Sequence, residues 1–203
     1  MAAKSGLRVY SKRRNIKKSG EPAGKRPKKR SGTKKPIFVI QKHAASHLHY
    51  DFRIEYNRVL KSWAVPKGPS LNPATKRLAM VTDDHPMSYA KFEGVIPPGN
   101  YGAGTVMVWD IGTYKNIKEK NGKAVSMREC FKRGTVEIFL SGKKLNGGFA
   151  LIRTGSDGDH WLLIKMRDEY ASARKNPVNT EKKSALTGRT MAQIKKDAQD
   201  GGS

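Results

Sequence analysis

The chain has 203 residues and a formal net charge of +24, from 41 lysines and arginines against 17 aspartates and glutamates. This length predicts one domain with tails, and the excess positive charge predicts a polyanionic partner, most simply nucleic acid. No apolar stretch of about eighteen residues is present, and the N-terminus lacks the apolar core of a signal peptide. The single cysteine, Cys130, excludes an internal disulfide. We therefore expect no membrane contact and a cytoplasmic, nucleoid-associated protein.

The positive charge is densest at the N-terminus. Residues 1–36 contain fourteen lysines and arginines but one acid, Glu21, whereas residues 37–171 contain twenty bases and thirteen acids. The stretch 17–35 is rich in Gly, Pro, Ser and Lys, so it cannot bury enough apolar surface to offset its chain entropy. We expect residues 1–36 to form a basic, loose arm. Such an arm either binds a polyanion or serves only as a solvated tail.

Eight short segments have the β-branched and aromatic residues of strands, and Gly and Pro turns separate them. They are 36–41, 49–56, 59–65, 76–82, 105–110, 134–140, 148–153 and 160–166. Helices are expected only at 127–132 and 191–198. This close spacing predicts a mainly β fold, an antiparallel sandwich or a small antiparallel β-barrel of about eight strands with few short helices. We place the barrel at residues 37–170 and a polar, loose C-terminal tail at residues 171–203.

Two further features receive structural interpretations. The glycine-rich stretch 99–104 lacks the lysine and the helix of a phosphate-binding P-loop, so we expect a tight turn between strands. The three tryptophans each lie within an apolar segment, which favours core packing over base stacking. They are Trp63, Trp109 and Trp161.

Three of the five histidines fall within seven residues, at His43, His47 and His49. If 49–53 is a strand, His49, Asp51 and Arg53 share one face and apolar residues take the other. A bend after His43 would bring its imidazole close to His49 and Asp51. Two imidazoles and a carboxylate form a ligand set that suits Mn, Fe, Co or Zn and leaves coordination positions open for substrate. His47 ranks below the other two. Alternatively, these histidines contact phosphates on a nucleic-acid surface.

A second candidate pair is Arg77 and His85. The two are eight residues apart, so a continuous strand would place them on one face. A guanidinium binds phosphate in a bidentate fork, and an imidazole can donate to a developing oxyanion. The alternative is a surface arginine and a histidine in a turn before proline.

Several segments, in order along the chain, resemble the 3′-phosphoesterase domain of bacterial DNA ligase D. They are 38–43, 49–53, 60–70, 84–86, 92–94, 96–97, 101–104 and 151–153. The resemblance covers nearly all of residues 8–168. Because polymerase and ligase modules are absent from the sequence, we expect a stand-alone member of the family.

The resemblance implies a small β-barrel with a polar, open end and a manganese-dependent enzyme, with Co²⁺ and Zn²⁺ as alternative metals. The family removes a terminal 3′ ribonucleoside and then the remaining 3′ phosphate, which leaves a 3′ hydroxyl for DNA end joining. The implied substrates are DNA or RNA-tailed DNA 3′ ends. The implied partners are an end-joining ligase, a polymerase and Ku-type proteins.

The resemblance also assigns roles to residues. The metal ligands would be His43, His49 and Asp51. The catalytic groups that bind the phosphate would be Arg53, Arg77 and His85. The supporting substrate-binding groups would be Arg14, Glu21, Gln41, Lys67 and Tyr89. The segment that contains Arg14 and Glu21 would fold over the site. The sequence departs from the family at three positions: Asn15 replaces the usual acid, Ala44 replaces a common aspartate, and His47 is atypical.

Two other functions remain open at this stage. A non-catalytic module could use the same cationic face to bind nucleic-acid ends. A metal nuclease could cut the strand internally.

Overall fold

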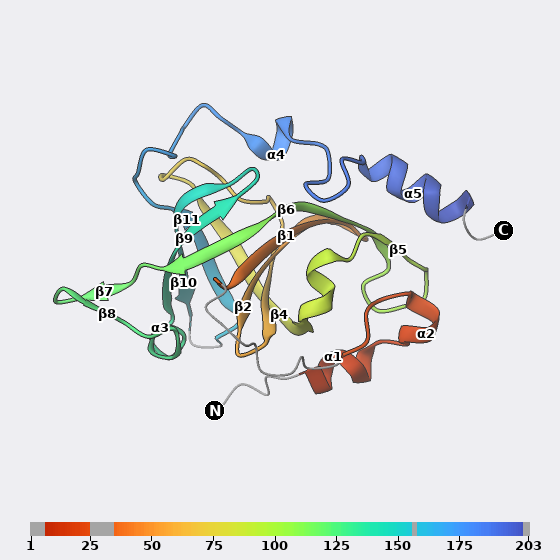
Figure 1. The fold of residues 1–203 in the computed structure, drawn as a ribbon, viewed down its shortest axis with the longest axis horizontal. Helices are drawn as coiled ribbons and strands as arrows, with labels where there is room; N and C mark the ends of the chain where they lie inside the picture. The colour runs from red at the N-terminus through yellow and green to blue at the C-terminus, as the bar shows by residue number, and fades with distance from the viewer. Residues whose placement is uncertain (1–6, 25–34, 156–157, 201–203) are drawn as a thin grey trace.

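A closed antiparallel β-barrel forms the body of the protein in the computed structural model, which describes residues 7–24, 35–155 and 158–200 (Figure 1). Each strand pairs with the next, and the first pairs with the last to close the barrel. In barrel order the strands are β1 (Ile37–Ala44), β2 (Leu48–Tyr56), β3 (Val59–Val65), β4 (Lys76–Pro86), β11 (His160–Lys165), β10 (Asn146–Thr154), β9 (Thr135–Gly142) and β6 (Gly104–Asn116). The predicted barrel of about eight strands is confirmed.

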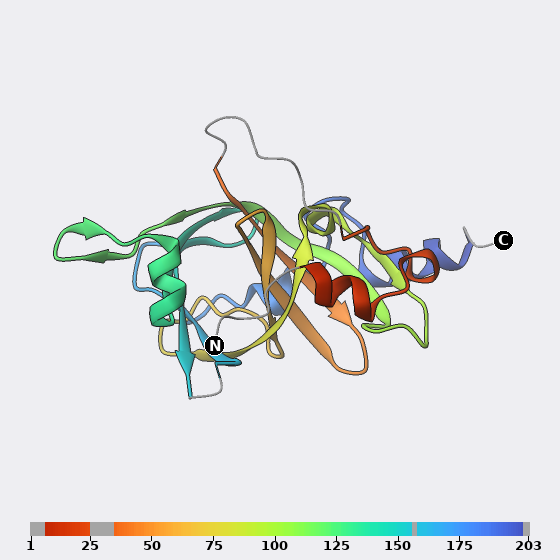
Figure 2. The same cartoon turned by 90° about the horizontal axis from the view of Figure 1, so that it is seen from below.

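Three short strands lie outside the barrel. Strand β5 (Gly94–Ile96) pairs with the first residues of β6. Strands β7 (Glu119–Lys120) and β8 (Lys123–Ala124) form a separate hairpin that projects from the body in both views (Figures 1 and 2). None of the three was expected from the sequence.

The helices are few and short, as expected. They are α1 (Leu7–Arg13), α2 (Ile16–Ser19), the 3₁₀ helix η1 (Met87–Lys91), α3 (Met127–Arg133), α4 (Pro177–Thr180) and α5 (Met191–Asp200). The sequence predicted α3 and α5 but not the others. The loose arm was expected at 1–36; residues 1–6 and 25–34 of it lie outside the described residues. Among the residues that the structure describes, no helix is long and apolar enough to cross a membrane.

Alternate side chains of all eight barrel strands fill a single apolar core. Strand β2 shows the pattern: Tyr50, Phe52 and Ile54 are buried in this core, as period-two alternation requires. The three tryptophans belong to the same core, so their predicted packing role is confirmed. One end of the barrel is covered by Phe131 of α3 and the other by Val178 of α4.

The C-terminal segment packs against the barrel, so the expectation of a loose tail is wrong for its described part. The side chain of Ile194 is buried in the core. The indole of Trp109 donates to the Glu181 carbonyl at 2.6 Å, and the amide of Ala185 donates to the Val108 carbonyl at 2.8 Å. The segment has few apolar residues, but backbone hydrogen bonds to barrel residues hold it in place.

Candidate metal and phosphate site

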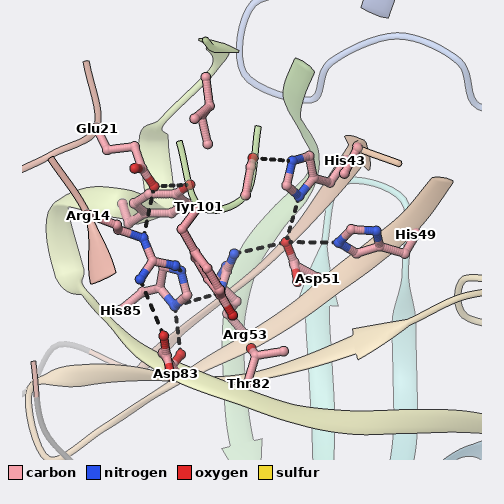
Figure 3. Close-up of a pocket in the computed structure, with 14 residues that line it drawn as sticks. Arg14, Glu21, His43, His49, Asp51, Arg53, Thr82, Asp83, His85 and Tyr101 are labelled. Carbon is pink, nitrogen blue, oxygen red and sulfur yellow. Dashed lines mark hydrogen bonds and ion pairs between the residues drawn. The ribbon is translucent and has the colours of Figure 1, made fainter. Parts of the chain in front are cut away.

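A polar pocket lies on the outward face of β1 and β2, opposite the apolar core (Figure 3). Because Phe131 and Val178 cover the two ends of the barrel, the expectation of a polar, open barrel end is wrong. The pocket is instead bordered by the N-terminal segment, the end of β4, η1 and the loop before β6. It is lined by Arg14, Glu21, His43, Ala45, His49, Asp51, Arg53, Thr82, Asp83, His85, Tyr89, Ile96, Tyr101 and Gly102.

Two histidines and one aspartate converge at one side of the pocket. Strand pairing places His43 directly opposite His49, and alternation places Asp51 on the same face of β2. Nδ1 of His43 lies 3.6 Å and Nε2 of His49 lies 3.8 Å from Oδ2 of Asp51. The three candidate ligand atoms all lie within 4.8 Å of one another, as ligands of one metal ion require. His47, by contrast, is exposed and lies outside this group.

The remaining nitrogen of each histidine contacts a backbone carbonyl. Nε2 of His43 lies 3.0 Å from the Gly102 oxygen, and Nδ1 of His49 lies 2.9 Å from the His47 oxygen. A carbonyl can only accept, so each of these nitrogens donates to it, and the other nitrogen of each ring faces Asp51. Orientation of metal-binding histidines through the second ring nitrogen is common at metal sites. The donor set therefore fits a transition metal.

Arg53 connects the three groups around it. Its guanidinium donates to Asp51 Oδ2 at 2.9 Å and to Gln41 Oε1 at 2.8 Å, and NH1 lies 2.8 Å from Nδ1 of His85. Burial raises the pKa of Asp51, but Arg53 and the two neighbouring histidines outweigh it and hold that pKa well below its usual range. Asp51 is thus an anion able to bind a cation.

His85 lies between two guanidinium groups. Nε2 is 3.2 Å from Arg14 NH2, and Nδ1 also lies 2.7 Å from the Asp83 carbonyl oxygen. Burial, followed by the charges of Arg53 and Arg14, lowers the pKa of His85 well below its ordinary value. The imidazole is therefore neutral near pH 7, and the positive charge at this side of the pocket belongs to the arginines.

The N-terminal segment contributes an ion pair to the pocket. Arg14 Nε donates to Glu21 Oε1 at 3.1 Å, and the Tyr89 hydroxyl donates to the same oxygen at 3.1 Å. The other carboxylate oxygen, Glu21 Oε2, is buried without a hydrogen-bond partner among the described residues. Asn15 is exposed and its side chain makes no capping hydrogen bond. The segment therefore reaches the pocket through Arg14 and Glu21 and not through Asn15.

Gln41 is buried beside Arg53 and does not line the pocket, and neither do two other expected site residues. Arg77 pairs with Leu163, which faces the core, whereas His85 faces the pocket. The predicted shared face is wrong because β4 carries a bulge: Ser62 pairs with Thr82 but Leu60 pairs with His85. One extra residue reverses the alternation. The other absent residue, Lys67, is exposed in the turn after β3. Roles for Arg77 and Lys67 in substrate binding stay predictions.

Several pocket residues were missed at the level of sequence. Asp83 accepts from Arg14 and from Arg13, at 3.4 and 3.2 Å. Tyr101 lies beside the same two arginines, with ring-centroid distances of 5.4 Å from Arg13 and 5.0 Å from Arg14. The expected turn at 99–104 was identified, but no local pattern shows that its tyrosine meets a segment more than eighty residues upstream.

Fold and site together define a β-barrel protein whose pocket holds a candidate metal site beside two guanidinium groups. The sequence profile of the family described as the DNA ligase D 3′-phosphoesterase domain matches residues 41–153. The chain belongs to this family, as the motifs predicted.

Individual relatives agree with the profile. The chain is 43% identical over 195 residues to the multifunctional non-homologous end joining protein LigD of Pseudomonas aeruginosa, covering 94% of this chain and 22% of that protein. It is 41% identical over 169 residues to the protein of the same name from Mycobacterium bovis, and the match covers 80% of this chain and 20% of that protein. The protein of the same name from Mycolicibacterium smegmatis is 40% identical over 163 residues, and the match covers 80% of this chain and 21% of that protein. The chain thus spans about a fifth of the length of these relatives.

Proposed function

We propose that the protein is a metal-dependent phosphoesterase that heals DNA 3′ ends for non-homologous end joining. It removes a terminal 3′ ribonucleoside and then the 3′ phosphate, and leaves a 3′ hydroxyl. The relatives are named as end joining proteins, which supports DNA ends as the substrate. A ligase, a polymerase and Ku-type proteins are the partners we expect in that process.

One observation carries the proposal: the cluster of His43, His49 and Asp51 lies directly beside Arg53. A phosphate ester needs both a cation that neutralises its oxygens and donors that hold them. A bound divalent ion would neutralise phosphate charge and lower the pKa of a bound water. Two imidazole nitrogens and one carboxylate suit a divalent transition metal, and among these the family resemblance implies Mn²⁺, with Co²⁺ or Zn²⁺ as alternatives.

The two pocket arginines keep donors for the substrate. A guanidinium has five N–H groups. Arg53 donates to Gln41 and Asp51, and Arg14 donates to Glu21 and Asp83. The neutral His85 has one acceptor nitrogen, so it accepts from only one of the two. Among the described residues, each arginine thus retains at least two N–H groups for a phosphate. His85 fixes the spacing between them and is itself within reach of a developing oxyanion.

Glu21 supplies an acceptor to the same pocket. Its Oε2 is buried and unpaired among the described residues, while Oε1 is held by Arg14 and Tyr89. A buried carboxylate oxygen without a donor is costly, so a ligand hydroxyl would find a ready partner there. We assign this oxygen to the ribose hydroxyls of the terminal nucleoside. Gln41 supports the site indirectly, because its amide donates to the carbonyls of Tyr89 and Phe92 while its oxygen accepts from Arg53.

The test is a time course on labelled DNA strands that end in a 3′ ribonucleotide, a 3′ phosphate or a 3′ hydroxyl. We expect the first strand to lose a nucleoside and then a phosphate, and the third to remain intact. Chelator should abolish both steps and Mn²⁺ should restore them. Tight binding without turnover would support the end-binding module instead. Internal cleavage of the 3′-hydroxyl strand would identify a nuclease.

A further inference from the structure

Positively charged side chains gather where the C-terminal segment crosses one end of the barrel, on a surface that the proposed chemistry does not use. Two adjoining hollows there share Leu71, Lys144 and Lys175. We call this surface the C-terminal basic groove and define it by seven cations: Lys42, Lys143, Lys144, Arg174, Lys175, Lys182 and Lys183. Figure 1 shows α4, which follows Arg174 and Lys175, on the opposite side of the barrel from α1.

The floor of the groove is rigidly built. The carboxylate of Asp110, which is fully buried, accepts the backbone N–H groups of Lys143, Lys144 and Leu145 at 2.9, 3.0 and 2.9 Å. These bonds fix the turn between β9 and β10 that presents the two lysines. The ammonium of Lys144 also lies 4.9 Å from the centre of the Trp109 ring. The lysines therefore have defined positions, unlike those of a freely solvated run.

The positive charge of the groove is only partly compensated: the ammonium groups of Lys143 and Lys144 donate to the carbonyls of Ala185 and Lys183, and Glu181 and Asp110 act on Lys144. None of its seven cations forms an ion pair within the part of the chain that the structure describes, whereas Lys61, Lys118 and Lys165 do. Two carboxylates line the hollows, Glu169 and Glu181, against four cations. Cations held this close favour an anionic ligand.

Strand β1 separates the groove from the candidate active site. Lys42 and His43 are neighbours on β1 and point to opposite faces of it, so the strand that carries a metal ligand also carries the first cation of the groove. A DNA strand that leaves the pocket must therefore pass around the end of β1 to reach these cations.

We propose that the C-terminal basic groove binds the phosphate backbone of the DNA that flanks the 3′ end. The proposal rests on the proposed function for the identity of the polyanion. The cations that line the two hollows outnumber the carboxylates, which fits a row of phosphates. The groove would position the duplex, while the pocket would act on its terminus.

A pair of matched variants tests the proposal. Arg174→Gln with Lys175→Gln removes two exposed cations from the groove, and Lys120→Gln with Lys123→Gln removes the same charge from the exposed β7–β8 hairpin. Affinity for a fluorescent duplex with an unmodified 3′ hydroxyl is measured by anisotropy across a salt series. We expect the groove variant to lose about ten-fold in affinity at low salt. The salt slope, which is the slope of log affinity against log salt concentration, should fall in magnitude by about 1 to 2. The hairpin variant should change less than about two-fold.

A trinucleotide strand that reaches only the pocket supplies a second measurement. The ratio of kcat/KM for the duplex to that for the trinucleotide should fall in the groove variant and stay constant in the hairpin variant. Equal weakening by both variants, or no weakening by the groove variant, would overturn the proposal. A weakening confined to the groove variant, in a protein that hydrolyses no 3′ end, would support the groove and reject the proposed catalytic function.

Discussion

At the scale of single residues, the pocket depends on a few buried polar groups that satisfy one another. Asp51 is an anion because Arg53 and two histidines surround it, and His85 is neutral because two arginines and burial oppose its protonation. Removing one partner from such a network leaves the others unpaired in a region of low dielectric, which costs more than the lost contact alone. Substitutions here should therefore have large effects.

The metal ligands give the first prediction. His43→Ala, His49→Ala and Asp51→Ala should each lower activity by at least about a hundred-fold, since loss of an outer partner alone commonly costs 10–100-fold. Each of these variants should also lose Mn²⁺ binding, which is measured from the electron paramagnetic resonance signal of free Mn²⁺. His47→Ala is the matched control, because that side chain is exposed. An inactive His47→Ala beside an active His49→Ala would refute the assignment.

His85 gives a prediction about pH and stability. Its folded pKa lies well below the unfolded value of about 6.5, so the unfolded state binds the extra proton on acidification. The contribution of His85 to the free energy of unfolding should be complete above about pH 6.5. Below about pH 6.5 the free energy of unfolding should fall by up to about 1.4 kcal/mol per pH unit. Urea unfolding in chelator from pH 7.5 to 5 should show this loss in the parent but not in His85→Asn. Asp51 titrates below this window and does not interfere, because its pKa is depressed.

Arg53 and Arg77 give a prediction about the two steps. Arg53→Ala should slow both, because its guanidinium contacts Asp51 inside the pocket. The monoester carries one more charge than the diester, so a guanidinium held against the phosphate should matter more for the second step. The family resemblance gives this role to Arg77, whose side chain lies on the core side of β4. Arg77→Ala is therefore expected to make the 3′-phosphate intermediate accumulate on a gel. Equal rates for both steps in this variant would remove Arg77 from the substrate-binding set.

At the scale of elements, two chain segments outside the barrel strands complete the structure. The N-terminal segment lies across the pocket through Arg14 and Glu21, and the C-terminal segment is fastened to the loop before β5. The fastening point is Glu93, whose carboxylate accepts from the Val108 amide at 2.8 Å, from the Thr187 hydroxyl at 2.7 Å and from the Ser184 hydroxyl. The side chain of Glu93 is 3% exposed.

Glu93→Ala should release the C-terminal segment. The substitution leaves a buried amide and two hydroxyls without their acceptor, so we expect a loss of roughly 1–3 kcal/mol in the free energy of unfolding. Limited proteolysis should then cut within residues 183–200 well before the barrel. Glu119→Ala, in the exposed hairpin, is the control. An unchanged cleavage pattern would show that other contacts hold the segment.

At the scale of the whole molecule, positive charge dominates the encounter with a polyanion. The formal charge of +24 raises the association rate and makes affinity salt-dependent. The charge has at least two separable parts. Residues 25–35 carry seven lysines and arginines, most of them outside the described residues, whereas the segment before them contributes Arg14 and Glu21 to the pocket.

Two changes to the N-terminal region should therefore behave differently. Replacing the seven basic residues of 25–35 by serine should lower the salt slope of DNA affinity by up to about six, with little effect on the rate at saturating DNA. Deleting residues 1–23 should slow single-turnover hydrolysis at saturating DNA, because Arg14 and Glu21 are lost. An unchanged single-turnover rate would contradict a role for the N-terminal segment in the reaction.

The sequence alone determined the features that follow from near neighbours. The alternation at 49–54 predicted one apolar and one polar face, and His49, Asp51 and Arg53 do share a face, because side chains of a strand alternate with period two. Strand content followed from the same local periodicity, which left a sandwich and a barrel open, and the family resemblance implied the barrel. The motifs identified the family for the same reason, since they are short runs whose order is written along the chain.

The tertiary structure decided what depends on distant contacts. The bulge in β4 placed His85 in the pocket and Arg77 on the core side, and it exists through pairing with β3. Helix α1, η1 and the ordered C-terminal segment lack a strong local pattern, and their positions come from partners far along the chain, such as Arg14 with His85, 71 residues apart. A local pattern encodes which face a side chain takes on a regular strand, whereas packing between remote segments decides where that strand departs from regularity and what lies against it.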